Sequence, residues 1–205
     1  MIVSGPTVYL VDDDAAVTRA IASLGSLMQL RIRAFGSAES LLAEEELPGE
    51  GCLILDIRLP GMSGLDLQTT LRERQCELPV IMISGHADVP LAVEAMRRGA
   101  LTVLEKPFGL EVIMQHIRNA VEVDRVQRDR ARQRDSVRER LAKLTPRERE
   151  VLALIPQGLT NKQMAAQLHL TLRAIEDRRA RLMRHLGVRS VAELLLLVQQ
   201  AQVAS

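Results

Sequence analysis

Aromatic side chains are scarce in this chain of 205 residues, which has no tryptophan, one tyrosine and two phenylalanines. Its hydrophobic cores must therefore be filled by Leu, Ile, Val, Met and Ala, and an apolar content of 47% is ample for that. Long apolar runs are also missing, since even the longest, such as residues 194–198, are far shorter than the roughly 18 residues of a membrane span. The first residues show no charged segment followed by an apolar stretch, as a secretory signal would. We expect a cytoplasmic protein that has no membrane partner.

Cysteines are few as well. Cys52 and Cys76 are the only two in the sequence, and neither stands at the spacing of a metal ligand. We interpret them as a buried strand thiol and an incidental thiol at a helix end. This usage is typical of a reducing compartment, in agreement with a cytoplasmic location.

Net charge is also low, at +1, but the two halves of the chain differ in sign. Residues 1–119 carry 10 Lys and Arg against 16 Asp and Glu, whereas residues 120–205 carry 17 against 10. An acidic half joined to a basic half indicates two separate jobs, with the basic half binding a polyanion.

Four short apolar runs in the acidic half each end in a polar residue suited to phosphate chemistry. The runs are residues 8–11, 53–55, 80–83 and 101–104, and they lead to Asp12 and Asp13, Asp56, Ser84 and Lys106. Short runs rich in bulky apolar residues predict strands buried on both faces of a parallel sheet. Because ligand sites in such sheets lie beyond the carboxyl ends of the strands, we expect these side chains to converge.

Segments with helical periodicity alternate with the strands. Asp14 and Ser37 are expected to cap two helices, the second running to about Glu46, and further helices follow Gly64 and end at Gly99. This alternation predicts a doubly wound α/β domain with a five-stranded parallel sheet.

The segment from Arg118 to Lys143 is rich in charged residues and contains no glycine or proline. We expect a solvated helix with ion pairs three and four residues apart, such as Asp124 with Arg128, that spaces two domains. A flexible linker is the alternative.

The last 60 or so residues predict a bundle of four short helices. The expected caps are Thr145 with Glu148 as a capping box, then Thr160, Thr171 and Ser190. The two middle helices form a helix-turn-helix pattern.

The polar residues at the strand ends suit phosphoryl transfer, which needs an acceptor oxygen, a cation and donors for the phosphoryl oxygens. Asp56 is the candidate acceptor, and Asp12 and Asp13 supply the oxygen ligands that Mg²⁺ prefers. Lys106 and Ser84 can donate to phosphate oxygens. A cis bond between Lys106 and Pro107 would aim the lysine inward.

The same residues resemble the receiver domain of bacterial two-component response regulators, the CheY-like fold. The matching motifs are Val11-Asp12-Asp13-Asp14, the segment 55–64 around Asp56, Ser84-Gly85-His86-Ala87-Asp88 and Glu105-Lys106-Pro107-Phe108. The resemblance implies that a histidine kinase phosphorylates Asp56. It also implies that Mg²⁺ or Mn²⁺ binds Asp13, Asp12, Asp56 and the backbone carbonyl of Arg58, and that Ser84 and Lys106 sense the phosphate.

One position departs from that family. Many receivers carry Tyr or Phe in the last strand as a switch coupled to the hydroxyl at Ser84, whereas this chain has Val103. A valine cannot make the same swing, so the relay from Ser84 must differ or be weaker.

The basic half carries a cluster of arginines on the expected second helix of the helix-turn-helix, residues 171–186. Such a helix enters the major groove, and arginine suits both phosphate and guanine. The candidate contacts to double-stranded DNA are Lys162, Arg173, Arg178, Arg179 and Arg181.

The segments 144–152 and 158–165 resemble the LuxR/NarL/FixJ-type helix-turn-helix, and it is this resemblance that implies phosphate contact by Lys162. Glu176 stands where the family often has a basic residue, so family base preferences do not carry over.

We therefore predict a receiver domain at residues 1–118, a helical linker at 119–142 and a DNA-binding domain at 143–205. The expected function is that of a FixJ-like response regulator that is phosphorylated on Asp56, pairs as a homodimer and controls transcription, with RNA polymerase as a further candidate partner.

The alternative is a DNA-binding regulator with a constitutive, unphosphorylated receiver, as Val103 suggests. A turnover phosphatase is disfavoured, because haloacid-dehalogenase enzymes need an acid where this chain has Arg58. We expect no enzymatic activity beyond self-phosphorylation and autodephosphorylation.

Overall fold

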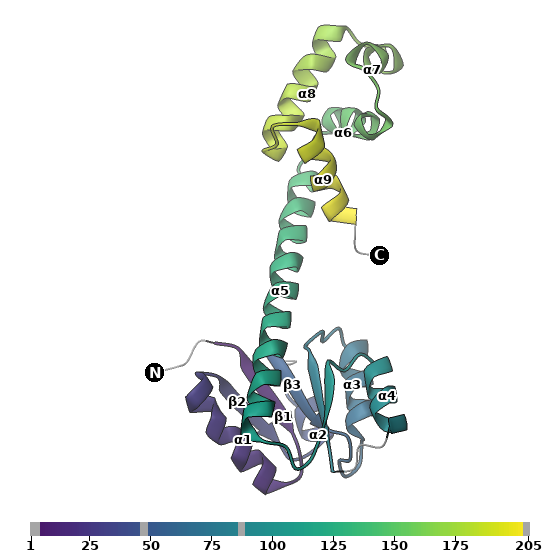
Figure 1. Ribbon diagram of the computed structural model, residues 1–205. Coiled ribbons are helices and arrows are strands. Elements are labelled where there is room, and N and C mark those ends of the chain that lie inside the picture. Colours follow the sequence, from purple (N-terminus) through teal and green to yellow (C-terminus); the bar gives the residue numbers. More distant parts are fainter. Residues whose placement is uncertain (1–4, 46–48, 86–88, 203–205) are drawn as a thin grey trace. The chain divides into compact units, whose positions relative to one another are not determined.

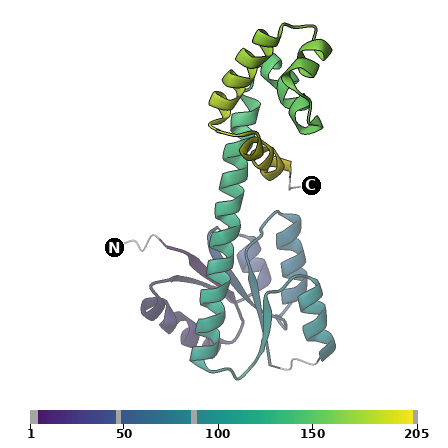
Figure 2. The same cartoon turned by 45° about the horizontal axis from the view of Figure 1, so that its top comes forward.

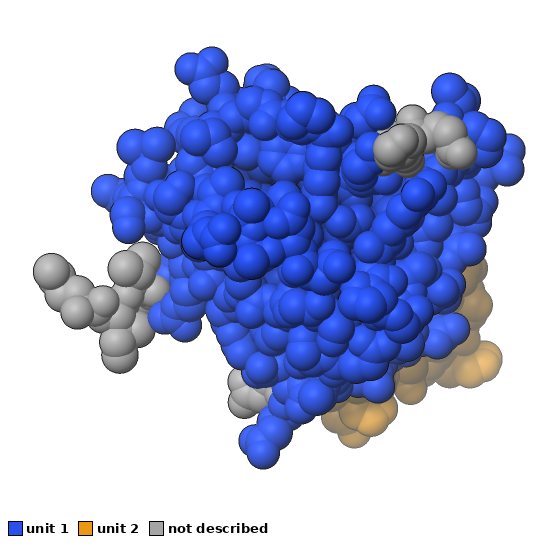
Figure 3. All heavy atoms as spheres, turned by 90° about the horizontal axis from the view of Figure 1, so that it is seen from below, with its two compact units in different colours: residues 1–128 blue, residues 129–205 orange. Residues whose placement is uncertain are grey.

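The computed structural model describes residues 5–45, 49–85 and 89–202. Residues His86 to Asp88 of the motif that begins at Ser84 lie outside the described residues, as does Glu46. The chain forms two compact units, residues 1–128 and residues 129–205, which Figure 3 distinguishes by colour. We call them the first and second unit and describe each by itself.

The first unit is built on a five-stranded sheet. The strands are β1 (Thr7–Val11), β2 (Arg31–Phe35), β3 (Gly51–Asp56), β4 (Val80–Ser84) and β5 (Thr102–Glu105). They are all parallel and lie in the order β2-β1-β3-β4-β5, which confirms the predicted doubly wound topology. Every residue of β1, β3 and β4 is buried, as expected for strands covered on both faces. The order of the strands reverses between β1 and β3, and the carboxyl ends at this point form the natural ligand site of the sheet.

Helices cover both faces of this sheet (Figures 1 and 2). One face packs against α1 (Ala15–Met28) and the first turns of α5 (Leu110–Ala142), and the other against α2 (Ala38–Leu42), α3 (Gly64–Glu73) and α4 (Val89–Arg97). Successive side chains of β1 point to opposite faces of the sheet and so contribute to both cores. Val8 and Leu10 face α1 and α5, whereas Tyr9 and Val11 face the other helix layer.

The predicted helix ends are largely confirmed. The carboxylate of Asp14 accepts the Ala16 N–H at 2.7 Å at the start of α1, and Gly99 adopts a positive φ of 84° just past α4. The helix capped by Ser37 is shorter than predicted and ends at Leu42. The chain turns there, and Glu44, just beyond the helix, forms an ion pair of 2.5 Å with Arg33 on β2.

Helix α5 runs without a break over 33 residues, from Leu110 to Ala142, which confirms a helical rather than a flexible connector. The predicted pair of Asp124 with Arg128 is present at 2.8 Å. Asp124 is buried and also accepts the Gly51 N–H at 2.9 Å, while Arg128 donates to the Gly49 carbonyl at 3.0 Å. The part of α5 in the first unit is therefore bonded to the amino-terminal end of β3.

The second unit is helical. It contains the last turns of α5 followed by α6 (Pro146–Leu154), η1 (Ile155–Gln157), α7 (Asn161–Gln167), α8 (Leu172–Leu186) and α9 (Val191–Gln202). The predicted caps at Thr145, Thr160, Thr171 and Ser190 are all formed. A core that includes Val151, Ile175 and Leu194 joins these helices, and α7 with α8 forms the predicted helix-turn-helix. Within the described part of the chain, we find no helix with the length and apolar character required to cross a membrane.

Candidate functional sites

Three side chains from distant parts of the sequence meet at the carboxyl edge of the sheet. Asp12 follows β1, Asp56 ends β3 and Lys106 follows β5. The Lys106 ammonium donates to Asp12 Oδ2 at 2.7 Å and to Asp56 Oδ2 at 2.6 Å. The parallel sheet thus brings together residues separated by 94 and by 50 positions, as the strand pattern predicted.

The backbone fixes the other oxygen of each carboxylate. The Asp14 N–H donates to Asp12 Oδ1 and the Arg58 N–H donates to Asp56 Oδ1, both at 2.8 Å. Close packing also holds Asp56, since a Cβ at Gly64 would lie 2.1 Å from the Asp56 carbonyl oxygen. Only glycine allows α3 to start this close to the strand, so the glycine belongs to the architecture of the site.

The electrostatics of the site follow from burial and from the lysine. Burial raises the pKa of Asp12, which is 2% exposed, and the hydrogen bond from Lys106 opposes that shift without cancelling it. Burial would lower the pKa of Lys106, but its hydrogen bonds to Asp12 and Asp56 outweigh burial, and the pKa lies above its ordinary value. The lysine is therefore held as a cation between two carboxylates.

The acidic cluster suits a hard divalent cation. Oxygen atoms of Asp12, Asp13 and Asp56 lie within 4.8 Å of one another, with Asp13 exposed and the other two buried. Carboxylate oxygens open to water on one side are the donor set that Mg²⁺ prefers. Arg58, whose carbonyl is the fourth expected ligand, lies directly beside this cluster through its N–H bond to Asp56.

Ser84 and Val103 lie on the neighbouring strands β4 and β5, where Val103 pairs with Met82, two residues before Ser84. Ser84 ends β4, is fully buried and accepts the Lys106 N–H on its backbone carbonyl at 2.7 Å. The bond between Lys106 and Pro107 is cis, as predicted. Val103 on β5 is partly buried and packs against the core on the α2–α4 face of the sheet.

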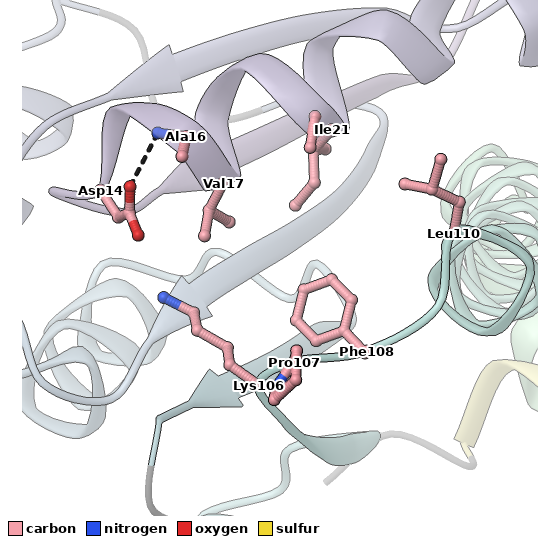
Figure 4. A pocket seen from close by; sticks show the side chains of 9 residues that line it. Asp14, Ala16, Val17, Ile21, Lys106, Pro107, Phe108 and Leu110 are labelled. Atoms are coloured by element: carbon pink, nitrogen blue, oxygen red, sulfur yellow. Dashed lines mark hydrogen bonds between the residues drawn. The ribbon is translucent and has the colours of Figure 1, made fainter.

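A hollow of about 410 Å³ borders Lys106 on the side of α1. Figure 4 shows Asp14 and the Lys106 ammonium at one end, with Phe108, Ile21 and Leu110 toward the other. Lys106 is thus bordered by an apolar surface as well as by the two carboxylates.

The candidate DNA contacts of the second unit fall into two groups. Arg173 and Arg181 on α8 and Lys162 on α7 are exposed. Arg178 is only 15% exposed and donates to Glu150 on α6 at 3.0 Å, and Arg179 donates to Asn161 at the start of α7. Among the described residues, the first group makes no bond to another helix, and Arg181 donates only to the Asp177 carbonyl of its own helix, whereas Arg178 and Arg179 bond α8 to α6 and α7.

Several polar contacts of α8 were not predicted from the sequence. Glu148, the capping residue of α6, also lies 3.3 Å from His185 of α8, and Arg140 of α5 donates to the Leu186 carbonyl at 3.0 Å. The capping-box pattern identified Glu148, but the partners of these residues are 37 and 46 positions away, and no spacing rule links them.

Two families match parts of this chain. Residues 8–118 match the family described as the response regulator receiver domain, and residues 142–198 match the bacterial regulatory proteins of the luxR family. The chain is 38% identical over 193 residues to the response regulator protein TmoT of Ectopseudomonas mendocina, which covers 94% of this chain and 88% of TmoT. It is also 38% identical over 197 residues to the transcriptional regulatory protein FixJ of Azorhizobium caulinodans, which covers 96% of this chain and 93% of FixJ.

Solved structures show the same relationship. The response regulator StyR is similar with a TM-score of 0.84 and 34% identity, over 96% of this chain and 100% of that one. Full-length FixJ from B. japonicum is similar with a TM-score of 0.59 and 32% identity, over 98% of each chain.

Proposed function

This chain belongs to the response regulators in which a receiver domain precedes a LuxR-type DNA-binding domain, and we propose that Asp56 is its phosphoryl acceptor. The family is one of transcriptional regulators rather than of enzymes. The observation that carries the assignment of Asp56 is its contact with Lys106 beside Asp12, at the edge where the strand order reverses. We further propose that the protein works in the cytoplasm, where its DNA is found.

The proposed reaction is an in-line transfer. An Asp56 carboxylate oxygen attacks the phosphorus of a phosphohistidine on the kinase, the P–N bond breaks, and its electron pair and a proton end on the imidazole. Mg²⁺ or Mn²⁺, held by Asp12, Asp13, Asp56 and the Arg58 carbonyl, would supply positive charge to the transferred oxygens. Lys106 would exchange its bond to Asp56 for one to a phosphoryl oxygen, and the Ser84 hydroxyl would donate to another.

Phosphorylation is proposed to act on the surface of α4 and β5. Val89, Val93 and Met96 on α4 are 76%, 43% and 49% exposed, which is high for large apolar side chains. Pairing of two receivers through this surface would place two helix-turn-helix units on adjacent half-sites. A dimer bound beside a promoter would be in a position to contact RNA polymerase.

The test of the acceptor is direct. Incubation of the full chain with acetyl phosphate and Mg²⁺ should add one phosphate, seen as an intact-mass increase of about 80 Da. The Asp56→Ala variant should lose this adduct, whereas Asp66→Asn, at an exposed carboxylate on α3, should keep it. An unchanged adduct in Asp56→Ala would place the acceptor elsewhere.

Val103 motivates a second candidate function, a regulator whose receiver acts without phosphorylation. Its side chain packs into the core on the α2–α4 face, and a valine has no ring to swing between that core and the surface. Analytical ultracentrifugation and DNA-binding measurements with and without acetyl phosphate distinguish the two. A mass and DNA affinity that respond to the phosphodonor support the first function, and indifference of both supports the second.

For DNA binding we propose Arg173, Arg181 and Lys162 as principal contacts. Arg178 and Arg179 already bond to Glu150 and Asn161. We propose that they contact the DNA while they keep these bonds, and so contribute less to it. Binding of a cationic helix to phosphates releases counterions, so the affinity should fall steeply with salt.

A further inference from the structure

The carboxyl end of α8 depends on a side chain from outside the helix-turn-helix. Leu186, the last residue of α8, is fully buried, so its carbonyl has no access to water. Arg140 Nη1 donates to that carbonyl at 3.0 Å. A buried carbonyl that loses its partner is costly, and a cation at this end of a helix also interacts favourably with the helix dipole.

The segment that supplies Arg140 is built into the second unit. Val137 on the same helix is only 3% exposed, and Leu141 packs against the core of the helical bundle. Arg149 on α6 in turn holds the end of α5, because its guanidinium donates to the carbonyls of Ala142 at 2.7 Å and Leu144 at 3.1 Å. The residues just before position 143 are thus part of the structure that supports α8.

The other end of α8 and its inner face are held from within the bundle, by the Thr171 cap and by the contacts of Arg178 with Glu150 and of His185 with Glu148. Arg140 adds a contact at the carboxyl end. Its Nε is buried and has no hydrogen-bond partner among the described residues, so the side chain keeps an unsatisfied donor in order to place Nη1 on the Leu186 carbonyl.

We infer that Arg140 is a positioning residue for the DNA-contacting helix, and that residues 137–142 of the expected linker are a working part of the DNA-binding unit. Arg140 acts through the Leu186 carbonyl and not by contact with DNA. The inference rests on the proposed role of α8 in DNA binding. It moves the start of the DNA-binding unit to before residue 143, where the sequence analysis placed the boundary of a domain at residues 143–205.

The test compares full-length variants. Arg140→Met keeps the aliphatic stem and removes the donors, Arg140→Lys restores one donor, and Arg138→Met is a matched control at an arginine that is 49% exposed. The probes are a duplex selected from a random library by the acetyl phosphate-treated wild-type chain, and a non-specific duplex of the same length. Affinity is measured over a range of salt concentrations, and amide hydrogen exchange is measured for residues 184–188.

Arg140→Met should bind the selected duplex roughly tenfold more weakly, while its affinity for the non-specific duplex stays within about twofold. The slope of affinity against salt should not change, because no phosphate contact is lost. Exchange at residues 184–188 should become faster, and Arg140→Lys should recover most of both effects. Arg138→Met should behave as wild type.

Two results overturn the inference: unchanged affinity and exchange in Arg140→Met, or a fall of about one in the salt slope, which would make Arg140 a phosphate contact. If the wild-type chain does not prefer the selected duplex, the proposed DNA-binding function fails instead. Hydrogen exchange then decides alone whether Arg140 positions the end of α8.

Discussion

At the scale of single residues, one lysine organises the acidic site. Lys106 bonds to both buried carboxylates, and these bonds hold the lysine as a cation. Asp13 stands apart, because it is exposed and forms no hydrogen bond with Lys106 in the described part of the chain, although one of its oxygens lies within 4.8 Å of those of Asp12 and Asp56. The geometry therefore separates the group that would bind only the metal from those that also hold the lysine.

This separation makes Asp13 the sharpest probe of the metal site. A ligand that binds only the folded state stabilises it, so millimolar Mg²⁺ should raise the melting temperature of the first unit at pH 7. Asp13→Asn should remove that increase while the melting temperature without metal changes little, because the Lys106 bonds remain. Glu73→Gln, at an exposed carboxylate on α3, is the control. A full response to Mg²⁺ in Asp13→Asn would exclude Asp13 as a ligand.

The two thiols allow a second prediction at this scale. Burial raises the pKa of Cys52 to about 12, and burial also raises the pKa of Cys76. Because the thiolate is the reactive form, both thiols should react slowly with a disulfide reagent at pH 8 in the native protein, and both should react at once in denaturant. Rapid labelling of the native chain would show that one of the two is more accessible than its 0% or 7% exposure indicates.

At the scale of helices and strands, sequence periodicity predicted most of the elements and their arrangement. The apolar runs predicted the sheet, and the strand-end rule placed Asp12, Asp56 and Lys106 together, because pairing of parallel strands leaves little choice of register. Local caps such as Thr145 were equally predictable. The pairings of Arg33 with Glu44 and of Arg178 with Glu150 were not, since each joins residues of different segments that sequence spacing does not link.

Asp124 gives the prediction at this scale. It was expected only as half of a surface ion pair, yet its carboxylate is buried and also bonds the Gly51 N–H. Asp124→Ala should lower the free energy of unfolding of the first unit by about 2–3 kcal/mol, the usual cost of losing hydrogen bonds to a buried charged group. Urea unfolding followed by circular dichroism measures this loss.

The matched control is Glu122→Ala, which removes an exposed carboxylate of the same helix within the first unit, whose partner Arg125 lies 2.6 Å away. Exposed pairs of this kind contribute little, so its effect should stay below about 0.5 kcal/mol. Equal effects of the two substitutions would mean that helix propensity, and not the bond to Gly51, accounts for the result.

At the scale of the whole molecule, the division of charge between the two halves corresponds to two compact units with separate sources of stability. The first unit contains the acidic cluster, and the second contains the arginines of α8. Arg128 ends the first unit and Asp129 begins the second, within the continuous helix α5. The stability of each unit should therefore respond to different solution conditions, even though one helix supplies residues to both.

Calorimetry of the full chain should show two transitions with separate dependences. Mg²⁺ should shift only the transition of the first unit.

In the second unit, the Thr145 N–H, together with the Thr145 hydroxyl and His185, lowers the pKa of Glu148 below its ordinary value of 4.5 despite burial. A lowered folded-state pKa contributes stability above the ordinary value and loses it as the pH falls through the folded value, so acid below about pH 4.5 should weaken the second transition. Glu148→Gln keeps an acceptor for the Thr145 N–H and should flatten that dependence, whereas one transition that responds equally to Mg²⁺ and acid would contradict the independence of the units.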